Sequence, residues 1–165
     1  MTPDDLVLTP TGLRFQGQRF PCSIGRGGIR SDKQEGDGAT PVGTHRIVAT
    51  LYRPDRMAPP ATWAIPIRPG DLWSDDVADA AYNLKVRAPY AHSHEVLRRA
   101  DPLYDLILVT DWNWPHAEKG RGSCIFIHQW RRPGFPTEGC VAFRRDHLHR
   151  IARTISPGTR LIVRP

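Results

Sequence analysis

The chain has 165 residues, the size of one ordinary domain, and such a domain buries enough surface to fold without a disulfide or a structural metal. Its net charge of +6 favours anionic partners or a solvated basic surface. No stretch approaches the roughly 20 apolar residues of a membrane helix, which excludes a helical membrane span.

The first half of the chain is predicted to consist of short strands and turns. The predicted strands are residues 6–7, 12–20 and 44–51. A glycine-rich loop occupies residues 25–38, and residues 53–75, rich in Pro, Asp and Trp, are predicted to be irregular. The 16 prolines and 14 glycines recur without a repeat period, which is typical of turns in a β-rich protein.

The second half combines apolar strands with one or two helices. The predicted strands are residues 103–110, 123–128 and 159–163. Residues 93–99 are predicted to form a short helix capped by Ser93. A second helix over residues 146–155 places Leu148 and Ile151 on one face and ends before Pro157-Gly158. Because no repeat or internal linker interrupts the pattern, residues 1–165 are expected to form one mostly β domain.

One segment carries a candidate nucleophile and a candidate base. His128 ends an apolar strand, and Cys140 follows twelve positions later (140 minus 128) after a loop containing Pro133, Gly134 and Pro136. A free thiol is mostly protonated at neutral pH, and a neighbouring imidazole removes its proton. Gly139 allows a tight turn before Cys140, and backbone N–H groups of such a turn are natural oxyanion donors.

Taken alone, a Cys/His pair is more often structural than catalytic. Cys140 would then be a small buried apolar residue and His128 a satisfied core histidine. Cys22 and Cys124 lack the surrounding motif and are expected to be buried apolar residues. No metal site follows from the cysteine and histidine spacing, and no cofactor is expected.

The wider pattern resembles the L,D-transpeptidase, or YkuD-like, family. The family motif is a strand-borne histidine, a loop, and Ser/Thr-x-Gly-Cys followed by an apolar residue; here these are His128, Thr137, Gly139, Cys140 and Val141. The upstream Thr-Pro-x-Gly turn of the family is similar to residues 40–43. The resemblance implies a β-sandwich-like catalytic domain and covers roughly residues 20–163.

The resemblance also implies a reaction. The cysteine would attack a peptidoglycan stem tetrapeptide at the L-centre of its third residue, usually meso-diaminopimelate, and expel the terminal D-alanine. An amine acceptor then gives a 3-3 crosslink (L,D-transpeptidation), and water gives a tripeptide (L,D-carboxypeptidase activity). Because family members are acylated by carbapenems, a carbapenem adduct on Cys140 is also expected.

The chain departs from the usual family site at two positions. Many members have Gly after the histidine and Arg two residues after the cysteine, where this chain has Gln129 and Ala142. Other substrate-binding residues must therefore be sought elsewhere in the chain. The candidates are Thr137, Arg131, Arg132, Trp130, Tyr82 and His94, each with packing or a solvated surface as the alternative.

The start of the chain favours water as the acceptor. Met-Thr-Pro-Asp-Asp has none of the features of a secretory signal, which indicates a cytoplasmic enzyme that meets free tetrapeptides or small muropeptides from wall turnover. The alternatives are a periplasmic location with transpeptidation as the main activity, a catalytically dead wall-binding domain, and a basic nucleic-acid-binding module. The last lacks any recognisable nucleic-acid motif, so neither nucleic acid nor membrane is an expected partner.

Overall fold

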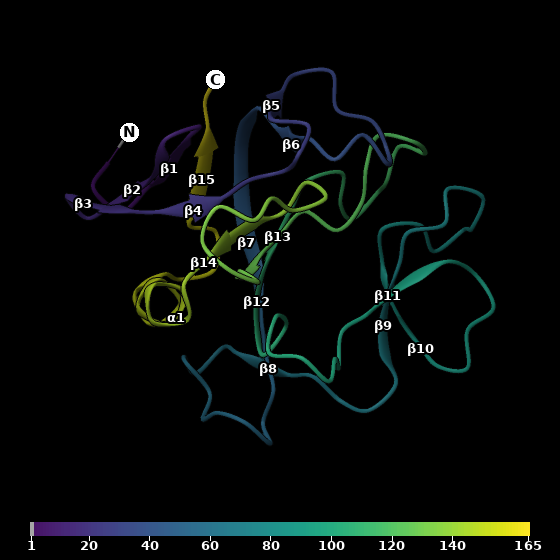
Figure 1. Cartoon of the computed structure of the whole chain (residues 1–165). Helices are drawn as coiled ribbons and strands as arrows, with labels where there is room; N and C mark the ends of the chain where they lie inside the picture. The colour runs from purple at the N-terminus through teal and green to yellow at the C-terminus, as the bar shows by residue number, and fades with distance from the viewer. Residues whose placement is uncertain (1) are drawn as a thin grey trace.

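The computed structural model describes residues 2–165 and shows a mostly β protein with one short helix (Figure 1), which confirms the expected fold class. The strands are β1 (Leu6–Thr9), β2 (Gly12–Phe15), β3 (Gln18–Phe20), β4 (Cys22–Ser23), β5 (Ile29–Arg30), β6 (Thr40–Pro41), β7 (Gly43–Tyr52), β8 (Ile65–Pro66), β9 (Asp71–Ser74), β10 (Lys85–Arg87), β11 (His94–Val96), β12 (Leu106–Thr110), β13 (Phe126–Gln129), β14 (Val141–Phe143) and β15 (Arg160–Val163). The helix is α1 (Arg145–Thr154). In residues 2–165, no helix has the length and apolar character needed to cross a bilayer.

A ten-stranded mixed sheet forms the body of the molecule. Its order is β3-β2-β1-β15-β7-β12-β13-β14-β4, and β8 pairs with β7 outside this path. The edge strands β3 and β4 are separated in the chain only by Pro21, so the sheet curves until it is nearly closed into a barrel-like shape. Strands β9, β10 and β11 form a separate three-stranded sheet on one side of the molecule (Figure 1).

Helix α1 supports the centre of the large sheet. Its buried residues Leu148, Ile151 and Ala152 share one face, which packs toward β12 and β13. Asp146 in the first turn and Arg153 in the last turn suit the helix dipole. The strand that carries His128 is therefore held by sheet pairing at its edges and by a helix on its face.

The predicted helix over residues 93–99 is wrong. His94–Val96 form strand β11, which pairs antiparallel with β9 and sets Val96 opposite Leu72. Seven residues give few helical hydrogen bonds after a costly first turn, so pairing with an existing strand is the more stable alternative.

The predicted strand over residues 12–20 is in fact a hairpin. Gln16 and Gly17 have φ values of 48° and 73°, and Phe15 pairs with Gln18 across them. Two consecutive residues with positive φ make a type I′ turn, which matches the twist of the flanking strands. Because Gln is an unusual choice at the first of these positions, the sequence pattern hid the turn.

The region predicted to be irregular, residues 53–75, contains β8 and β9. Strand β9 is short, but all four of its residues are buried at the centre of the three-stranded sheet. Its buried Asp71 forms ion pairs with Lys85 at 2.8 Å and Arg87 at 3.5 Å on the neighbouring strand. These long-range ion pairs compensate a buried charge that the local sequence alone argues against.

The Gln16-Gly17 turn gives a stability prediction. Gln16→Asn is expected to raise the free energy of unfolding by roughly 0.5–1 kcal/mol, because Asn adopts positive φ with less strain than Gln. Urea unfolding measures the difference. Gln18→Asn is the matched control, since Gln18 lies in β3, where Asn is unfavourable; equal effects of the two changes would contradict the turn assignment.

Candidate active site

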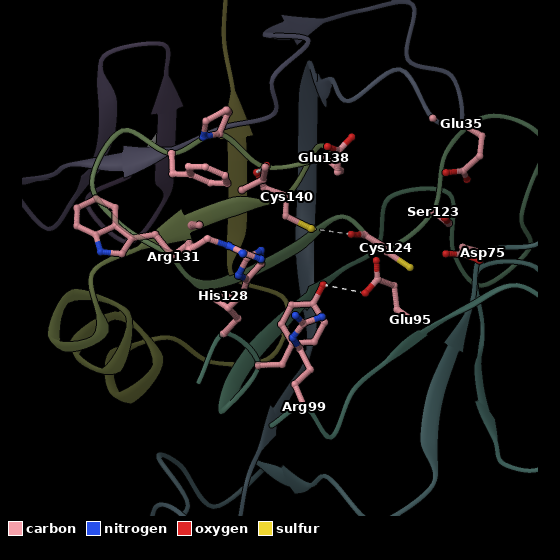
Figure 2. Close-up of a pocket in the computed structure, with 18 residues that line it drawn as sticks. Glu35, Asp75, Glu95, Arg99, Ser123, Cys124, His128, Arg131, Glu138 and Cys140 are labelled. Carbon is pink, nitrogen blue, oxygen red and sulfur yellow. Dashed lines mark hydrogen bonds between the residues drawn. The ribbon is translucent and has the colours of Figure 1, made fainter. Parts of the chain in front are cut away.

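Parallel pairing of β13 with β14 brings His128 and Cys140 to one cleft. The register sets His128 opposite Ala142, and Cys140 directly precedes β14. Because side chains alternate along a strand, Cys140 and Ala142 share a face. All three residues line a cleft of about 440 Å³, and Figure 2 shows the His128 ring and the Cys140 thiol in it.

A backbone hydrogen bond fixes the tautomer of His128. Its Nδ1 lies 2.8 Å from the carbonyl oxygen of Gln129, which only accepts, so Nδ1 carries the proton and donates it. The lone pair of the neutral ring is therefore on Nε2. Tyr104 packs edge-on against the ring, with centroids 5.1 Å apart. Since the orienting group is a main-chain carbonyl, the replacement of Gly by Gln at position 129 leaves this contact available.

Two main-chain groups hold the Cys140 thiol. The thiol donates to the carbonyl oxygen of Cys124 at 2.9 Å, and the N–H of Phe126 donates to Sγ at 3.4 Å (Figure 2 shows the first contact). The residue is 9% exposed. The sulfur therefore sits at the floor of the cleft with its proton directed at the main chain.

Burial keeps both groups neutral in the resting protein. It raises the pKa of the Cys140 thiol to about 12, although the Phe126 N–H opposes the shift. It lowers the pKa of His128 to about 4, against the opposing effect of the Gln129 carbonyl. At neutral pH the pair is thus a neutral thiol and a neutral imidazole.

The side chain of Thr137 stabilises the turn before Cys140. The Thr137 hydroxyl donates to the Cys140 carbonyl at 2.5 Å and accepts from the Gly139 N–H at 3.2 Å. Gly139 has a φ of +134°, a region that other residues rarely adopt. Thr137 lines the cleft, but its one hydroxyl hydrogen is committed to the turn.

Asn83 fixes the segment that supplies the thiol's acceptor. Its side-chain oxygen accepts from the N–H of Cys124 at 3.1 Å and from the Trp73 indole at 2.9 Å. Its amide nitrogen donates to the carbonyls of Trp112 and Asn113. Cys124 itself has a φ of +54°, uncommon for a residue with a side chain. The strained residue is thus tied to three other segments by one amide.

Side chains of both charges line the cleft. Figure 2 shows Glu35 and Asp75 on one side of the thiol and Arg131 on the other, with Glu95 and Arg99 also lining the cleft. Burial and the nearby Asp75 raise the pKa of Glu95, whose carboxylate accepts a long 3.4 Å hydrogen bond from Tyr104. Arg99 pairs with Asp101 at 2.6 Å and stacks over the Tyr104 ring.

Comparison with known proteins assigns the family. The profile of the YkuD family, described as the L,D-transpeptidase catalytic domain, matches residues 11–163. The chain belongs to this family. It is therefore a catalytic domain of a cysteine acyltransferase family.

One solved structure is similar to this chain in fold but distant in sequence. An L,D-transpeptidase from Mycobacterium smegmatis has 13% identity and a TM-score of 0.47, over 97% of this chain and 58% of the mycobacterial chain. This chain thus spans a little over half the length of that protein. No curated protein matches.

The structure separates the other sequence candidates of this YkuD domain. Trp130 and Arg131 line the cleft with Thr137, whereas Tyr82, His94 and Arg132 are not among its lining residues. Tyr82 is buried and donates to Glu35, His94 contacts the Tyr90 ring, and Arg132 stacks over Phe135.

Sequence reasoning missed several cleft residues, among them Glu95 and Arg99. Both lie in or beside β11, the segment that the pattern assigned to a helix. Their approach to Cys140 depends on the three-stranded sheet, which no local sequence pattern indicated. Among residues 2–165, no group of three or more His, Cys, Asp or Glu side chains is arranged to hold a metal ion.

The neutral pair of this YkuD domain gives a pH prediction. With a thiol pKa near 12, the thiolate fraction and the rate of Cys140 alkylation by iodoacetamide should rise about tenfold per pH unit from pH 7 to 10. Mass mapping of the labelled peptide gives the rate at this cysteine alone. A rate that stays level between pH 5 and 8 would instead reveal a thiolate–imidazolium pair and contradict the prediction.

Proposed function

We propose that this YkuD domain releases the terminal D-alanine from peptidoglycan stem tetrapeptides, with Cys140 as nucleophile and His128 as general base. The observation that carries the proposal is the cleft itself, which brings together a thiol, an imidazole whose lone pair is on Nε2, and both cationic and anionic side chains. These are the parts that acyl transfer from a charged peptide requires.

The first half of the reaction forms an acyl-enzyme. Nε2 of His128 takes the thiol proton as sulfur attacks the carbonyl carbon of the third residue, and the C=O π electrons move onto oxygen. When the C=O bond re-forms, the bond to the D-alanine nitrogen breaks. That nitrogen takes the proton from the imidazolium and leaves as an amine, so Cys140 carries the peptide as a thioester.

In the second half, water replaces the sulfur. His128 takes a proton from the water while the water oxygen adds to the thioester carbonyl carbon. Collapse of the tetrahedral intermediate then expels the Cys140 thiolate. The thiolate recovers the proton from His128. The tripeptide leaves with a new carboxylate, and the resting neutral pair is restored.

The cationic and anionic side chains of the cleft suit the charged groups of the proposed substrate. A third residue such as meso-diaminopimelate carries an ammonium and a carboxylate on its side chain, and D-alanine ends in a carboxylate. Arg131 and Arg99 are suited to the carboxylates, and Glu95 with Asp75 to the ammonium. A cation beside Glu95 would also favour its ionised form, which burial disfavours in the free protein.

The size of the cleft supports water as the main acceptor. A volume of about 440 Å³ falls in the range of a site for one small ligand. A second hollow lies on α1 beside Arg144 and Arg153, and none of its lining residues lines the cleft. Water needs no second docking groove, whereas an acceptor stem peptide does. Formation of 3-3 crosslinks by an amine acceptor is the competing outcome.

The same chemistry extends to carbapenems. A carbapenem offers a strained acyl donor to the thiol and leaves no small amine to depart, so the proposed product is a stable adduct on Cys140.

Incubation with a tetrapeptide tests the proposal directly. Mass analysis should show tripeptide and free D-alanine as main products, with only a minor crosslinked share when an amine acceptor is added. Cys140→Ala should abolish turnover, and His128→Ala should lower it by about 10²-fold or more. Cys22→Ala, remote from the cleft, is the control. Full activity in Cys140→Ala would refute the assignment, and dominant crosslinking would make the enzyme a transpeptidase.

Glu95 provides a test of how the ammonium of the substrate is bound. Glu95→Gln should raise KM about tenfold for a tetrapeptide with a free side-chain ammonium, the scale of one charge-assisted hydrogen bond. The KM for a peptide acetylated at that amine should change little. Glu118→Gln is the control, because Glu118 is exposed and pairs with Arg121 outside the cleft. Equal effects on both peptides would show that Glu95 does not bind the ammonium.

A further inference from the structure

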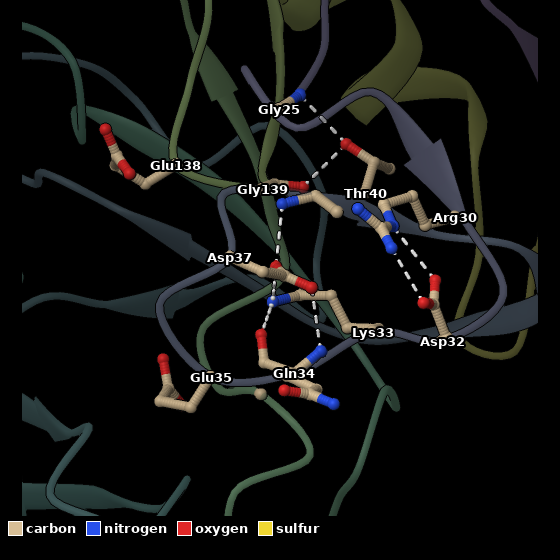
Figure 3. Close-up of polar contacts among 12 residues, drawn as sticks. Gly25, Arg30, Asp32, Lys33, Gln34, Glu35, Asp37, Thr40, Glu138 and Gly139 are labelled. Carbon is tan, nitrogen blue, oxygen red and sulfur yellow. Dashed lines mark hydrogen bonds and ion pairs between the residues drawn. The ribbon is translucent and has the colours of Figure 1, made fainter.

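One buried hydroxyl joins the two sequence motifs of the domain. Thr40 is fully buried; it donates to the carbonyl oxygen of Gly139 at 2.9 Å and accepts from the N–H of Gly25 at 2.9 Å (Figure 3). Thr40 begins the Thr-Pro-x-Gly segment, and Gly139 immediately precedes Cys140. The hydrogen bond therefore connects residues 99 positions apart at the back of the catalytic turn.

The surroundings of this hydrogen bond leave no space for another arrangement. A Cβ on Gly25 would lie 2.9 Å from the Gly139 Cα, and a Cβ on Gly139 would lie 2.8 Å from the Ala39 carbonyl oxygen. The loop that carries Thr40 is itself braced, because Asp37 accepts from the buried Lys33 at 2.6 Å and from the Ala39 N–H at 2.8 Å (Figure 3). Thr40 is thus a rigid support.

The direction of the Gly139 carbonyl sets the direction of the next N–H. In a planar trans peptide the C=O of Gly139 and the N–H of Cys140 point to opposite sides. The carbonyl points at Thr40, which does not line the cleft, so the N–H points away from Thr40. Among residues 2–165 this N–H has no hydrogen-bond partner, although Cys140 is 9% exposed.

We propose that Thr40 is a positioning residue that aims the Cys140 N–H at the oxyanion of the acyl-transfer reaction. The inference rests on the proposed function. As sulfur bonds to the carbonyl carbon, the π pair moves to oxygen, and the free N–H donates to that oxygen. Thr40 touches neither substrate nor sulfur; it acts by preventing rotation of the Gly139–Cys140 peptide.

Two reactions of the same thiol test the role. Acylation by p-nitrophenyl acetate passes through an oxyanion, whereas alkylation by iodoacetamide displaces iodide and forms none. Thr40→Val, which removes the hydroxyl but keeps the shape, should slow acylation by about 10²-fold, the scale of one lost oxyanion donor. Alkylation should stay within about twofold of the unaltered protein, and Thr40→Ser should restore most of the acylation rate. Intact-mass analysis follows both adducts.

Matched variants separate positioning from general damage. Thr50→Val makes the same change at another fully buried threonine, whose hydroxyl has no hydrogen-bond partner in residues 2–165, and should leave both rates unchanged. If Thr40→Val fails to fold, Thr40→Ala removes the same hydroxyl with a smaller side chain, and the same comparison of acylation with alkylation applies.

The outcomes distinguish this inference from the proposed function. The role of Thr40 would be overturned if Thr40→Val slowed acylation and alkylation equally, or if it left acylation unchanged. It would also be overturned if the unaltered protein were not acylated at all. A protein that is acylated by the ester in a Thr40-dependent way but releases no D-alanine from tetrapeptide would retain the positioning role and lose the proposed substrate.

Discussion

The parallel pairing of β13 with β14 is the constraint on which the site depends. Side chains alternate between the faces of a strand, so a slip of one residue would move either His128 or Cys140 to the opposite face. Two features hold the register. Helix α1 follows β14 after the single residue Arg144 and packs back toward β13, and the strands on both sides, β12 and β4, close the ladder. The small side chain of Ala142, opposite His128, leaves room for the imidazole.

Burial determines how the proposed reaction starts. A thiol and an imidazole that are both buried remain neutral. The thiolate–imidazolium ion pair common in other cysteine enzymes is therefore unfavourable before substrate binds. The main chain contributes the orienting groups: a carbonyl for the imidazole, and a carbonyl and an N–H for the sulfur. Because none of these depends on a side chain, the family's usual Gly after the histidine can be exchanged for Gln129 without loss of the hydrogen bond.

The sequence predicted the strands, the helix and the motif residues that depend on short stretches of the chain. Apolar runs gave the strands that carry His128 and precede it, and the periodicity of Leu148 and Ile151 gave helix α1 within one residue at each end. The cysteine and histidine could be picked out because they sit in a short motif. Glu95 and Arg99 could not, because they reach the cleft only through the pairing of β11 with β9, a contact between segments about twenty residues apart with β10 between them in the chain. Likewise, nothing local indicates that the Thr40 hydroxyl meets Gly139 across the fold.

The amide of Asn83 has a consequence for how the protein opens. One side chain bonds to Trp73 in the three-stranded sheet, to the loop at Trp112 and Asn113, and to Cys124 beneath the thiol. Segments joined in this way exchange their amide hydrogens as a cooperative unit. A fluctuation that detaches the small sheet would therefore release the carbonyl that holds the sulfur. The three-stranded sheet and the floor of the cleft would therefore open together. Hydrogen exchange would give the amides of both regions the same free energy of opening.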